Sequence, residues 1–427
     1  MRSAWRSERG LDWFTFFVAD IQTGFGPFLA VYLTTQKWNQ ADLGLILSIG
    51  SLAGLISQLP AGWLVGVAPS KRRLAMVAVI GIGLSALLIA LFPSFLGILA
   101  AKLLHVASSS VLGPVIAAIT LGLVGHAAVG PRLGRNARFA AIGNGLAAVV
   151  MGTFGDLISP QAVFLVTAML ALPTLLALLA IREGDIDAVA ADGGMVGAAA
   201  LPPLAVIARL LRKRSLLVLM LGIFLFHAAN AAMLPLVGTE MAKRPDHVLL
   251  PLIHLEISLG QWANLLIALC IVVPQLVVAA IAPGVGRLAV SYGRRPVLLL
   301  GFAALPARAA ILALSGDPTV VVTAQMLDGV SAAVLGVLVP LSLADISRGT
   351  GRFNLAQGIA ASATGIGAAV STAVGGYLAA KYGAGTAFLG LAATAAAAFL
   401  TLLVAMPETA PSNIFGPQAN RTKPPTL

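Results

Sequence analysis

Two long apolar runs of the chain flank the stretch Gly286-Arg287-Leu288-Ala289-Val290-Ser291-Tyr292-Gly293-Arg294-Arg295-Pro296. Its two glycines, Gly286 and Gly293, permit a tight backbone reversal with positive φ. Arg294 and Arg295 cannot follow the flanking runs into hydrocarbon, because a charge inside a bilayer is costly. A degenerate copy, Gly62-Trp63-Leu64-Val65-Gly66-Val67-Ala68-Pro69-Ser70-Lys71-Arg72, lies 224 residues earlier (286 minus 62). Two related basic turns, one in each half of the chain, predict a duplicated membrane protein.

The composition supports a protein whose surroundings are lipid. The 427 residues are 59% hydrophobic and 10% charged, with a mean hydropathy of +0.96. A soluble domain carries roughly 25% charged residues, so this chain lacks the polar surface that water requires. The formal charge of +11 does not indicate a nucleic-acid partner, because the basic residues lie in short loops without interleaved aromatic residues. The single cysteine, Cys270, excludes an intrachain disulfide.

Twelve apolar segments are long enough to cross a bilayer core, which takes about 20 residues of helix. We therefore predict an all-α membrane protein with twelve transmembrane helices, arranged as two six-helix pseudo-symmetric bundles around a central cavity. The first segment is too long for the core of a signal peptide and is expected to be retained. The segments are about 11–34, 42–67, 73–93, 95–123, 137–158, 161–181, 215–239, 262–283, 296–315, 318–343, 353–379 and 384–406.

The basic residues between these segments predict the orientation. Of the 27 Lys and Arg residues, 21 fall on one side of the predicted membrane, four on the other, and two, Lys102 and Arg308, within segments. The positive-inside rule then predicts a multi-pass protein of the plasma (bacterial inner) membrane with both termini cytoplasmic. The expected divisions are a first bundle at 1–181, a cytoplasmic linker at 182–214, a second bundle at 215–408 and a cytoplasmic tail at 409–427.

The repeat extends into the fourth and tenth segments. Lys102-Leu103-Leu104-His105-Val106-Ala107-Ser108-Ser109-Ser110-Val111-Leu112-Gly113 matches Gln325-Met326-Leu327-Asp328-Gly329-Val330-Ser331-Ala332-Ala333-Val334-Leu335-Gly336 at an offset of 223 (325 minus 102), with identical residues at five aligned positions. Because each half has six segments, both copies have the same orientation. This is expected for halves related by an axis along the membrane normal.

The two basic turns resemble a conserved loop of the major facilitator superfamily, roughly Gly-x-Leu-x-Asp-Arg-x-Gly-Arg-Arg/Lys, which occurs between helices two and three and again between eight and nine. The fourth segment resembles that superfamily's fourth-helix pattern Arg-x-x-Gln-Gly, written here as Lys102-x-x-His105-Val106. The resemblance implies a secondary transporter of the twelve-helix type. It also implies that the turns form conformational-switch loops, whose residues here are Gly62, Arg72, Gly286, Gly293, Arg294 and Arg295.

The chain departs from the superfamily's patterns at two places. The loop aspartate is Gly66 in the first copy and Val290 in the second. In the superfamily this aspartate helps to latch the two halves on the cytoplasmic side, so a latch here must use other groups or be weak. The Gly-Pro pair that marks drug antiporters in helix five is absent from residues 143–152. The main sequence argument for export is thereby removed.

Ionisable groups inside a bilayer are candidate functional groups, because they are costly to bury. Asp20 lies near mid-membrane and is expected to bind and release a proton, or else to be a structural carboxylate bonded to a neighbouring helix. Lys102 and His105 share one face of the fourth segment and replace the helix-four pattern linked to proton transfer in the superfamily. Snorkelling of Lys102 and ordinary packing of His105 are the alternatives.

The second half offers matching candidates. Asp328 is equivalent to His105 and could face it, or neutralise Lys102, across the cavity, either as a static pair or as one that breaks during transport. His227 and Asn230 share one face of the seventh segment, and His titrates near neutral pH; core hydrogen bonding is the alternative. Asn144 and Gln325 are weaker candidates. Arg308, on a helix that packs outside the cavity in this superfamily, is expected to be structural.

These features favour a non-enzymatic secondary transporter without cofactor or metal. The sequence has no Gly-Lys dipeptide and thus no phosphate-binding loop, and it has no His-Glu-x-x-His. We expect proton-coupled movement of a small-molecule substrate by alternating access, with a lean towards efflux of an amphipathic compound because the expected cavity is mostly apolar. The alternatives are an importer or facilitator of a metabolite or metal chelate, and a non-transporting scaffold or sensor. His247 and His254, in an outer loop, fit substrate capture or solvation better than a metal site.

Overall fold

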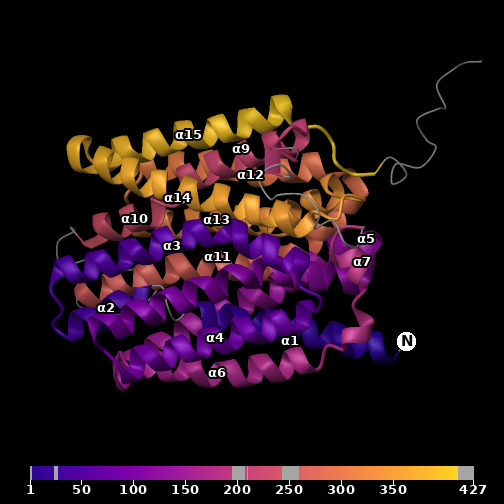
Figure 1. Ribbon diagram of the computed structural model, residues 1–427. Helices are drawn as coiled ribbons and strands as arrows, with labels where there is room; N and C mark the ends of the chain where they lie inside the picture. The colour runs from indigo at the N-terminus through magenta and orange to yellow at the C-terminus, as the bar shows by residue number, and fades with distance from the viewer. Residues whose placement is uncertain (1, 24–26, 195–206, 209, 243–258, 412–427) are drawn as a thin grey trace, which may run out of the picture.

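The computed structural model describes residues 2–23, 27–194, 207–208, 210–242 and 259–411, and these residues form helices and turns without a β-strand. The helices lie lengthwise in one elongated body (Figure 1). Their bounds are α1 (Arg2–Thr23), α2 (Pro27–Thr35), α3 (Gln40–Val67), α4 (Lys71–Leu91), α5 (Phe95–Leu157), α6 (Ala162–Leu179), η1 (Glu183–Asp185), α7 (Ala188–Ala191), α9 (Arg214–Asn230), α10 (Met233–Ala242), α11 (Leu259–Tyr292), α12 (Arg294–Leu314), α13 (Pro318–Ile346), α14 (Phe353–Tyr382) and α15 (Ala384–Ala405).

The twelve predicted spans are present in this arrangement. Ten described segments are long and apolar enough to cross a membrane, with α9 and α10 counted together and α5 counted once. Helix α5 holds two spans, and α1 with α2 supplies the first, which gives twelve. The prediction of an all-α membrane protein with two six-helix halves is confirmed.

The fourth and fifth spans are joined differently from the prediction. The sequence suggested a loop at 124–136, but these residues belong to α5, which is interrupted only at Gly125 (φ 66°, ψ 177°). A glycine adopts that backbone conformation without a steric penalty. The two parts of α5 then run side by side, as the 2.8 Å hydrogen bond from Asn136 Nδ2 to Thr120 Oγ1 shows. The predicted loop was wrong because its arginines lie on a helix that continues beyond the apolar run.

The turn after the eighth span also differs from the prediction. Helix α11 continues to Tyr292, so Gly286 is helical, and positive φ occurs at Gly293 (φ 93°). Gly286 instead allows close packing, because a Cβ there would collide with the carbonyl oxygen of Gly130 on α5. Gly62 is likewise inside α3. Two of the three switch-loop glycines, Gly62 and Gly286, therefore serve helix contacts rather than turns.

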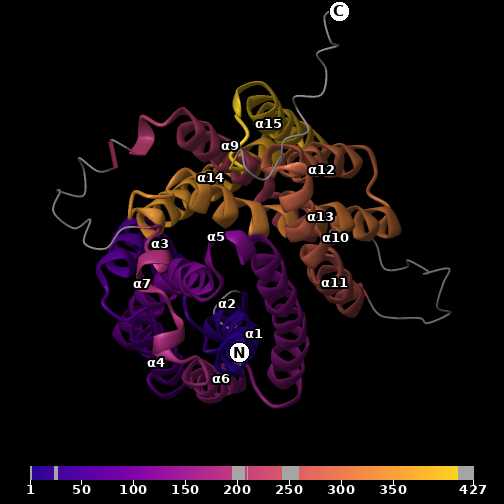
Figure 2. The same cartoon turned by 90° about the vertical axis from the view of Figure 1, so that its right-hand side faces the viewer.

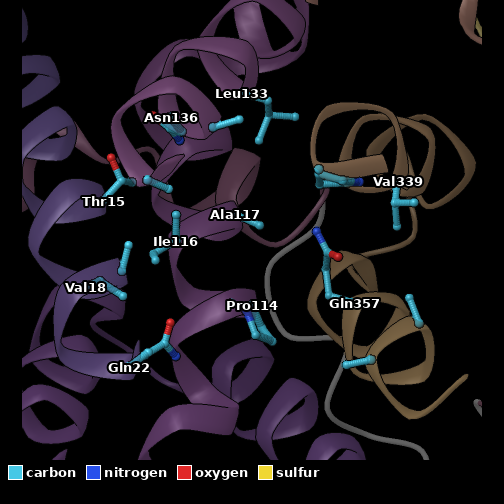
Figure 3. Close-up of a pocket in the computed structure, with 18 of the residues that line it drawn as sticks. Thr15, Val18, Gln22, Pro114, Ile116, Ala117, Leu133, Asn136, Val339 and Gln357 are labelled. Carbon is cyan, nitrogen blue, oxygen red and sulfur yellow. The ribbon is translucent and has the colours of Figure 1, made fainter. Parts of the chain in front are cut away.

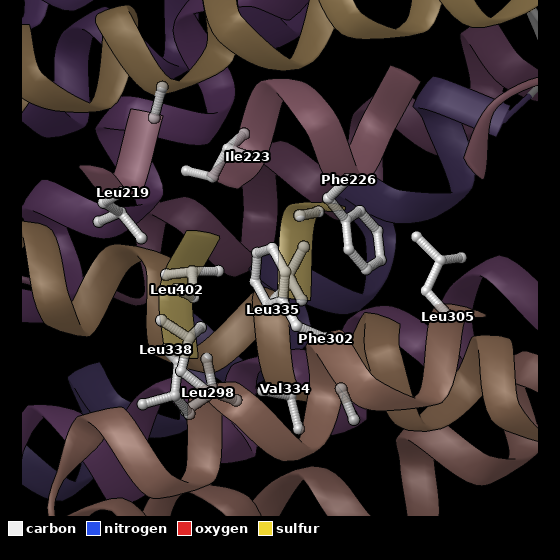
Figure 4. Packing of buried hydrophobic residues seen from close by; sticks show 14 of the residues in the cluster. Leu219, Ile223, Phe226, Leu298, Phe302, Leu305, Val334, Leu335, Leu338 and Leu402 are labelled. Atoms are coloured by element: carbon white, nitrogen blue, oxygen red, sulfur yellow. The ribbon is translucent and has the colours of Figure 1, made fainter. Parts of the chain in front are cut away.

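The chain forms two packed halves. Residues of α1 to α6 form one apolar core, and those of α9 to α15, together with part of α5, form another. Figure 2 shows the indigo-to-magenta and orange-to-yellow helices as two groups. In the second core, the rings of Phe226 and Phe302 meet edge to face at 5.1 Å beside Leu335 (Figure 4).

One end of the body, called the basic end below, carries the start of α1, the α3–α4 turn, the turn at Gly293 and residues 183–194 (Figure 1, right). Ser7 of α1 donates a 2.6 Å hydrogen bond to Asp185 there. The backbone N–H of Arg294 donates to Glu408, beyond the last helix, at 2.9 Å. The start of the chain, the connecting segment and the last described residues therefore share one end.

Candidate functional site

A cavity of about 410 Å³ lies between the two halves. Helices α1 and α5 line it from the first half, and α13 and α14 from the second (Figure 3). Apolar and small side chains form most of its wall, and no ionisable side chain is among its described lining residues. The polar lining residues are Thr15, Gln22, Asn136, Asn144, Gln357 and Thr364.

The amides in this central cavity offer hydrogen-bonding groups to a bound molecule. Asn136 Nδ2 is engaged by Thr120, whereas its buried Oδ1 has no hydrogen-bond partner among the described residues. Gln22 donates to Ser109 at 2.8 Å. An unpaired buried acceptor is costly, so a ligand donor at Asn136 would remove that cost. Of the predicted residues, Asn144 lines this cavity.

A second cavity of about 370 Å³ adjoins the first, since both are lined by Gly336, Val339, Pro340 and Thr364. Its other walls come from α9 and α13 and include His227, Asn230 and Asp328. The ionisable groups that line these two adjoining cavities are thus gathered in the second half. Three of the predicted site residues meet here.

A buried arginine fixes this ionisable cluster. The Arg308 side chain, 2% exposed, extends from α12 and forms an ion pair with Asp328 at 2.6 Å. The same guanidinium donates to Asn230 of α9 and to Gln325 of α13, each at 2.6 Å. Gln325 is fully buried and holds Arg308 rather than lining either cavity. Sequence reasoning assigned Arg308 to packing outside the cavity, and nothing in its own helix shows that its partners line one.

The remaining predicted residues lie elsewhere. Asp20 is buried between α1 and α5, where a Cβ on Gly143 would approach its Oδ1 to 3.1 Å. That oxygen has no hydrogen-bond partner among the described residues. Lys102 packs on α3, where a Cβ on Gly50 would lie 2.6 Å from its Cε, and His105 is buried. None of the three lines a cavity described above, and Asp328 pairs with Arg308 rather than Lys102. His247 and His254 lie outside the described residues.

The first half has a charged cluster that the sequence did not reveal. Asp12 of α1, 2% exposed, pairs with Arg132 at 2.8 Å. Arg135 donates to both oxygens of the same carboxylate. Both arginines were predicted in a loop, so their pairing with a helical aspartate was not expected.

The two basic turns are held by carboxylates from outside their own motif. Arg294 pairs with Asp345 of α13 at 2.9 Å, and Glu408 accepts from the backbone of Arg294 and Arg295. In the first copy, Lys71 pairs with Asp192 of the connecting segment at 2.8 Å, and Arg72 with Glu183 at 3.3 Å. Burial raises the pKa of the Asp192 carboxyl, and the Lys71 ammonium acts against that rise. The turns are therefore tied down without the aspartate missing at Gly66 and Val290.

Two halves around a shared cavity are the arrangement expected of a membrane transporter. The family model of the Major Facilitator Superfamily matches residues 13–244 and 246–426, and the chain belongs to this family. The chain is 37% identical over 411 residues to two proteins of Mycobacterium tuberculosis (strains CDC 1551 / Oshkosh and ATCC 25618 / H37Rv), each described as an uncharacterized MFS-type transporter; the match covers 96% of this chain and 95% of theirs.

A solved structure confirms the fold. The crystal structure of the human organic anion transporter MFSD10 (TETRAN) superimposes with a TM-score of 0.68 and 16% sequence identity, and covers 93% of this chain and 99% of its own. At that identity the likeness concerns the fold alone.

Proposed function

We propose that this transporter couples the movement of a small, uncharged amphipathic solute to protons, with efflux as the favoured direction. The observation that supports the solute class is the central cavity, whose wall, as far as the structure describes it, combines apolar surface with four amides and no ionisable side chain. A charged solute would lose its hydration there without a counter-charge, which is strongly unfavourable. Amides supply both donors and acceptors. An uncharged molecule with hydrogen-bonding groups and an apolar body fits this wall.

The adjoining cavity supports a separate place for the proton. Asp328 is a carboxylate at a cavity wall, with a 25% exposed side chain, and His227 lines the same space. Protonation of Asp328 would leave the guanidinium of Arg308 without its counter-charge, which is costly while it stays buried. We therefore expect proton uptake to accompany a movement of α12 against α13. Asn230 of α9 and Gln325 of α13 also accept hydrogen bonds from Arg308. Asp20, a buried carboxylate outside the cavities, is the second candidate proton site.

Proton coupling is measurable in proteoliposomes with a panel of uncharged amphipathic solutes. Asp328→Asn is expected to abolish solute-induced proton movement, because an amide side chain does not bind and release a proton near neutral pH. Solute binding is expected to persist. Asp317→Asn is the matched control: Asp317 caps the same helix at its exposed end, and asparagine caps equally well. Proton movement opposite to the solute means export, and movement with it means uptake. Coupling that survives in both Asp328→Asn and Asp20→Asn would reject both sites.

The orientation in the membrane is also a proposal, with the basic end cytoplasmic. Single cysteines are introduced by Arg6→Cys, Lys213→Cys and Lys37→Cys in a Cys270→Ser background, and a membrane-impermeant thiol reagent is applied to sealed vesicles. The first two positions are at the basic end and Lys37 is at the other. We expect Arg6→Cys and Lys213→Cys to react from the cytoplasmic side, and Lys37→Cys from the opposite one. Reaction of the first two from different sides would reject the topology.

A further inference from the structure

The connecting segment 183–194 is built into the first half of the molecule. Asp185 accepts from Ser7 of α1 at 2.6 Å, and the backbone N–H of Asp187 donates to the carbonyl of Gly122 on α5 at 2.9 Å. Ala191 is fully buried in the core of the first half, with Ile186 packed against it. Because these contacts involve backbone, side chains and core together, this segment moves with the first half.

The end of the same segment also contacts the second half. Asp192 Oδ1 accepts from Lys71 at 2.8 Å and from Asn354 Nδ2 of α14 at 2.9 Å. Lys71 is 5% exposed and Asn354 1% exposed, so both hydrogen bonds are shielded from water and retain most of their strength. One carboxylate oxygen thus joins a side chain from each half.

Backbone contacts strengthen this junction. Gly193 and Gly194 have positive φ (89° and 99°), which turns the segment towards the α13–α14 connection. There the N–H of Gly349 donates to the carbonyl of Gly193 at 2.7 Å, and Asn354 Nδ2 also donates to the carbonyl of Ala191 at 3.2 Å. All of these second-half donors belong to residues 349–354.

The partners of Lys71 show where the junction would separate. Its ammonium also donates to the carbonyls of Val65 and Ala68 in its own half, at 2.7 and 3.0 Å. Asp192 therefore keeps Lys71 as a partner when the halves move apart, since both belong to the first half. The contacts to Asn354 and Gly349 are the ones that break. The separating surface lies between residues 192–194 and 349–354.

We propose that residues 183–194 act as a latch that holds the basic end closed, with Asp192 in place of the carboxylate absent at Gly66 and Val290. The junction is next to a close approach of α3 and α14, where a Cβ on Gly358 would lie 2.7 Å from the Gln58 carbonyl oxygen. Separation of these helices requires the latch to release. The latch presumes that the halves part at this end, and it is independent of which solute or ion is carried.

Distance measurements between spin labels test the latch. The labels are attached after Arg73→Cys on α4 and Arg348→Cys beside the latch, both exposed, in a Cys270→Ser background in lipid nanodiscs without added solute. Asn354→Asp places a second carboxylate at the oxygen of Asp192. This variant loses the hydrogen bond from position 354 to Asp192, and the two carboxylates repel each other. The ratio of long to short distances between the spin labels is therefore expected to rise about tenfold. The exchange variant Asp192→Asn with Asn354→Asp reverses donor and acceptor, and is expected to restore the short distance.

Two further variants make the result specific. Asp185→Asn changes a carboxylate of the same segment that bonds Ser7 within the first half, and is expected to leave the distances unchanged. Asn354→Ala, which removes the donor without adding charge, is expected to shift the ratio in the same direction by a smaller factor. An unchanged distance in Asn354→Asp, no restoration in the exchange variant, or an equal shift in Asp185→Asn would each overturn the latch. Because the readout is a distance, its failure would not bear on the proposed solute or proton site.

Discussion

Gly62→Ala is expected to reduce transport by about tenfold or more, because the two halves could no longer meet at the basic end. A Cβ at Gly62 would lie 2.6 Å from the carbonyl oxygen of Asn354 and 2.9 Å from Cα of Gly358. Both are backbone atoms of α14, so one added methyl group would force α3 and α14 apart. The conformational step that closes the basic end would then be lost. Solute flux in proteoliposomes measures the loss of transport. The distance between the spin labels at positions 73 and 348 measures how far this end has opened.

Gly66→Ala provides the matched control one turn further along α3. A Cβ there would be 3.9 Å from Cβ of Asn354, which is an ordinary contact. Alanine is favoured over glycine in a helix by about 0.5–1 kcal/mol, so this variant is expected to transport normally with unchanged or slightly higher stability. Normal transport by Gly62→Ala would show that this backbone contact is not needed.

Arg308→Gln is expected to lower the free energy of unfolding by about 3–5 kcal/mol, the usual effect of removing one partner of a buried ion pair. The change leaves Asp328, Asn230 and Gln325 without the donor that joins α9, α12 and α13. Thermal unfolding with a thiol-reactive dye suits this chain, because its single cysteine, Cys270, is buried on α11. Arg287→Gln, at an exposed arginine, is expected to unfold as the wild type does.

The double variant Arg308→Gln with Asp328→Asn separates charge from shape. Two amides of similar size remove the uncompensated carboxylate, and replacement of a buried ion pair by a neutral set is often tolerated. Most of the lost stability is therefore expected to return, while solute-induced proton movement stays absent. Equal stability of Arg308→Gln alone and the wild type would contradict a buried ion pair at this position.

The sequence predicted the number of spans and their two-half arrangement, because long apolar runs and basic turns follow directly from the lipid environment. The ends of helices were predicted less well. Hydropathy marks the hydrocarbon core, whereas α1 and α11 continue past it into polar surroundings. The stretch 124–136, predicted as a loop, belongs to α5, and Asp12 pairs there with Arg132 and Arg135, a compensation that no local pattern records.

The candidate site was predicted in part. Asp328, His227 and Asn230, chosen as polar residues within apolar segments, line one cavity and Asn144 the other; their roles stay predictions. Arg308 and Asp192 were not recognised. Arg308 is 20 residues before Asp328 on another helix (328 minus 308), and Asp192 is 121 residues after Lys71 (192 minus 71). Pairings across such separations depend on tertiary structure and leave no periodic or spacing signal.

The shared wall of the two cavities, built from α13 and α14 around Gly336, Val339, Pro340 and Thr364, has an evolutionary consequence. The four amides that would recognise cargo and the charged cluster behind Asp328 are separate sets of residues. Mutations at Gln22, Asn136, Asn144 or Gln357 would alter which compound is bound. They would leave the proposed proton site at Asp328 unchanged. Related proteins with this arrangement are expected to diverge faster in the solute that they carry than in the ion that drives transport.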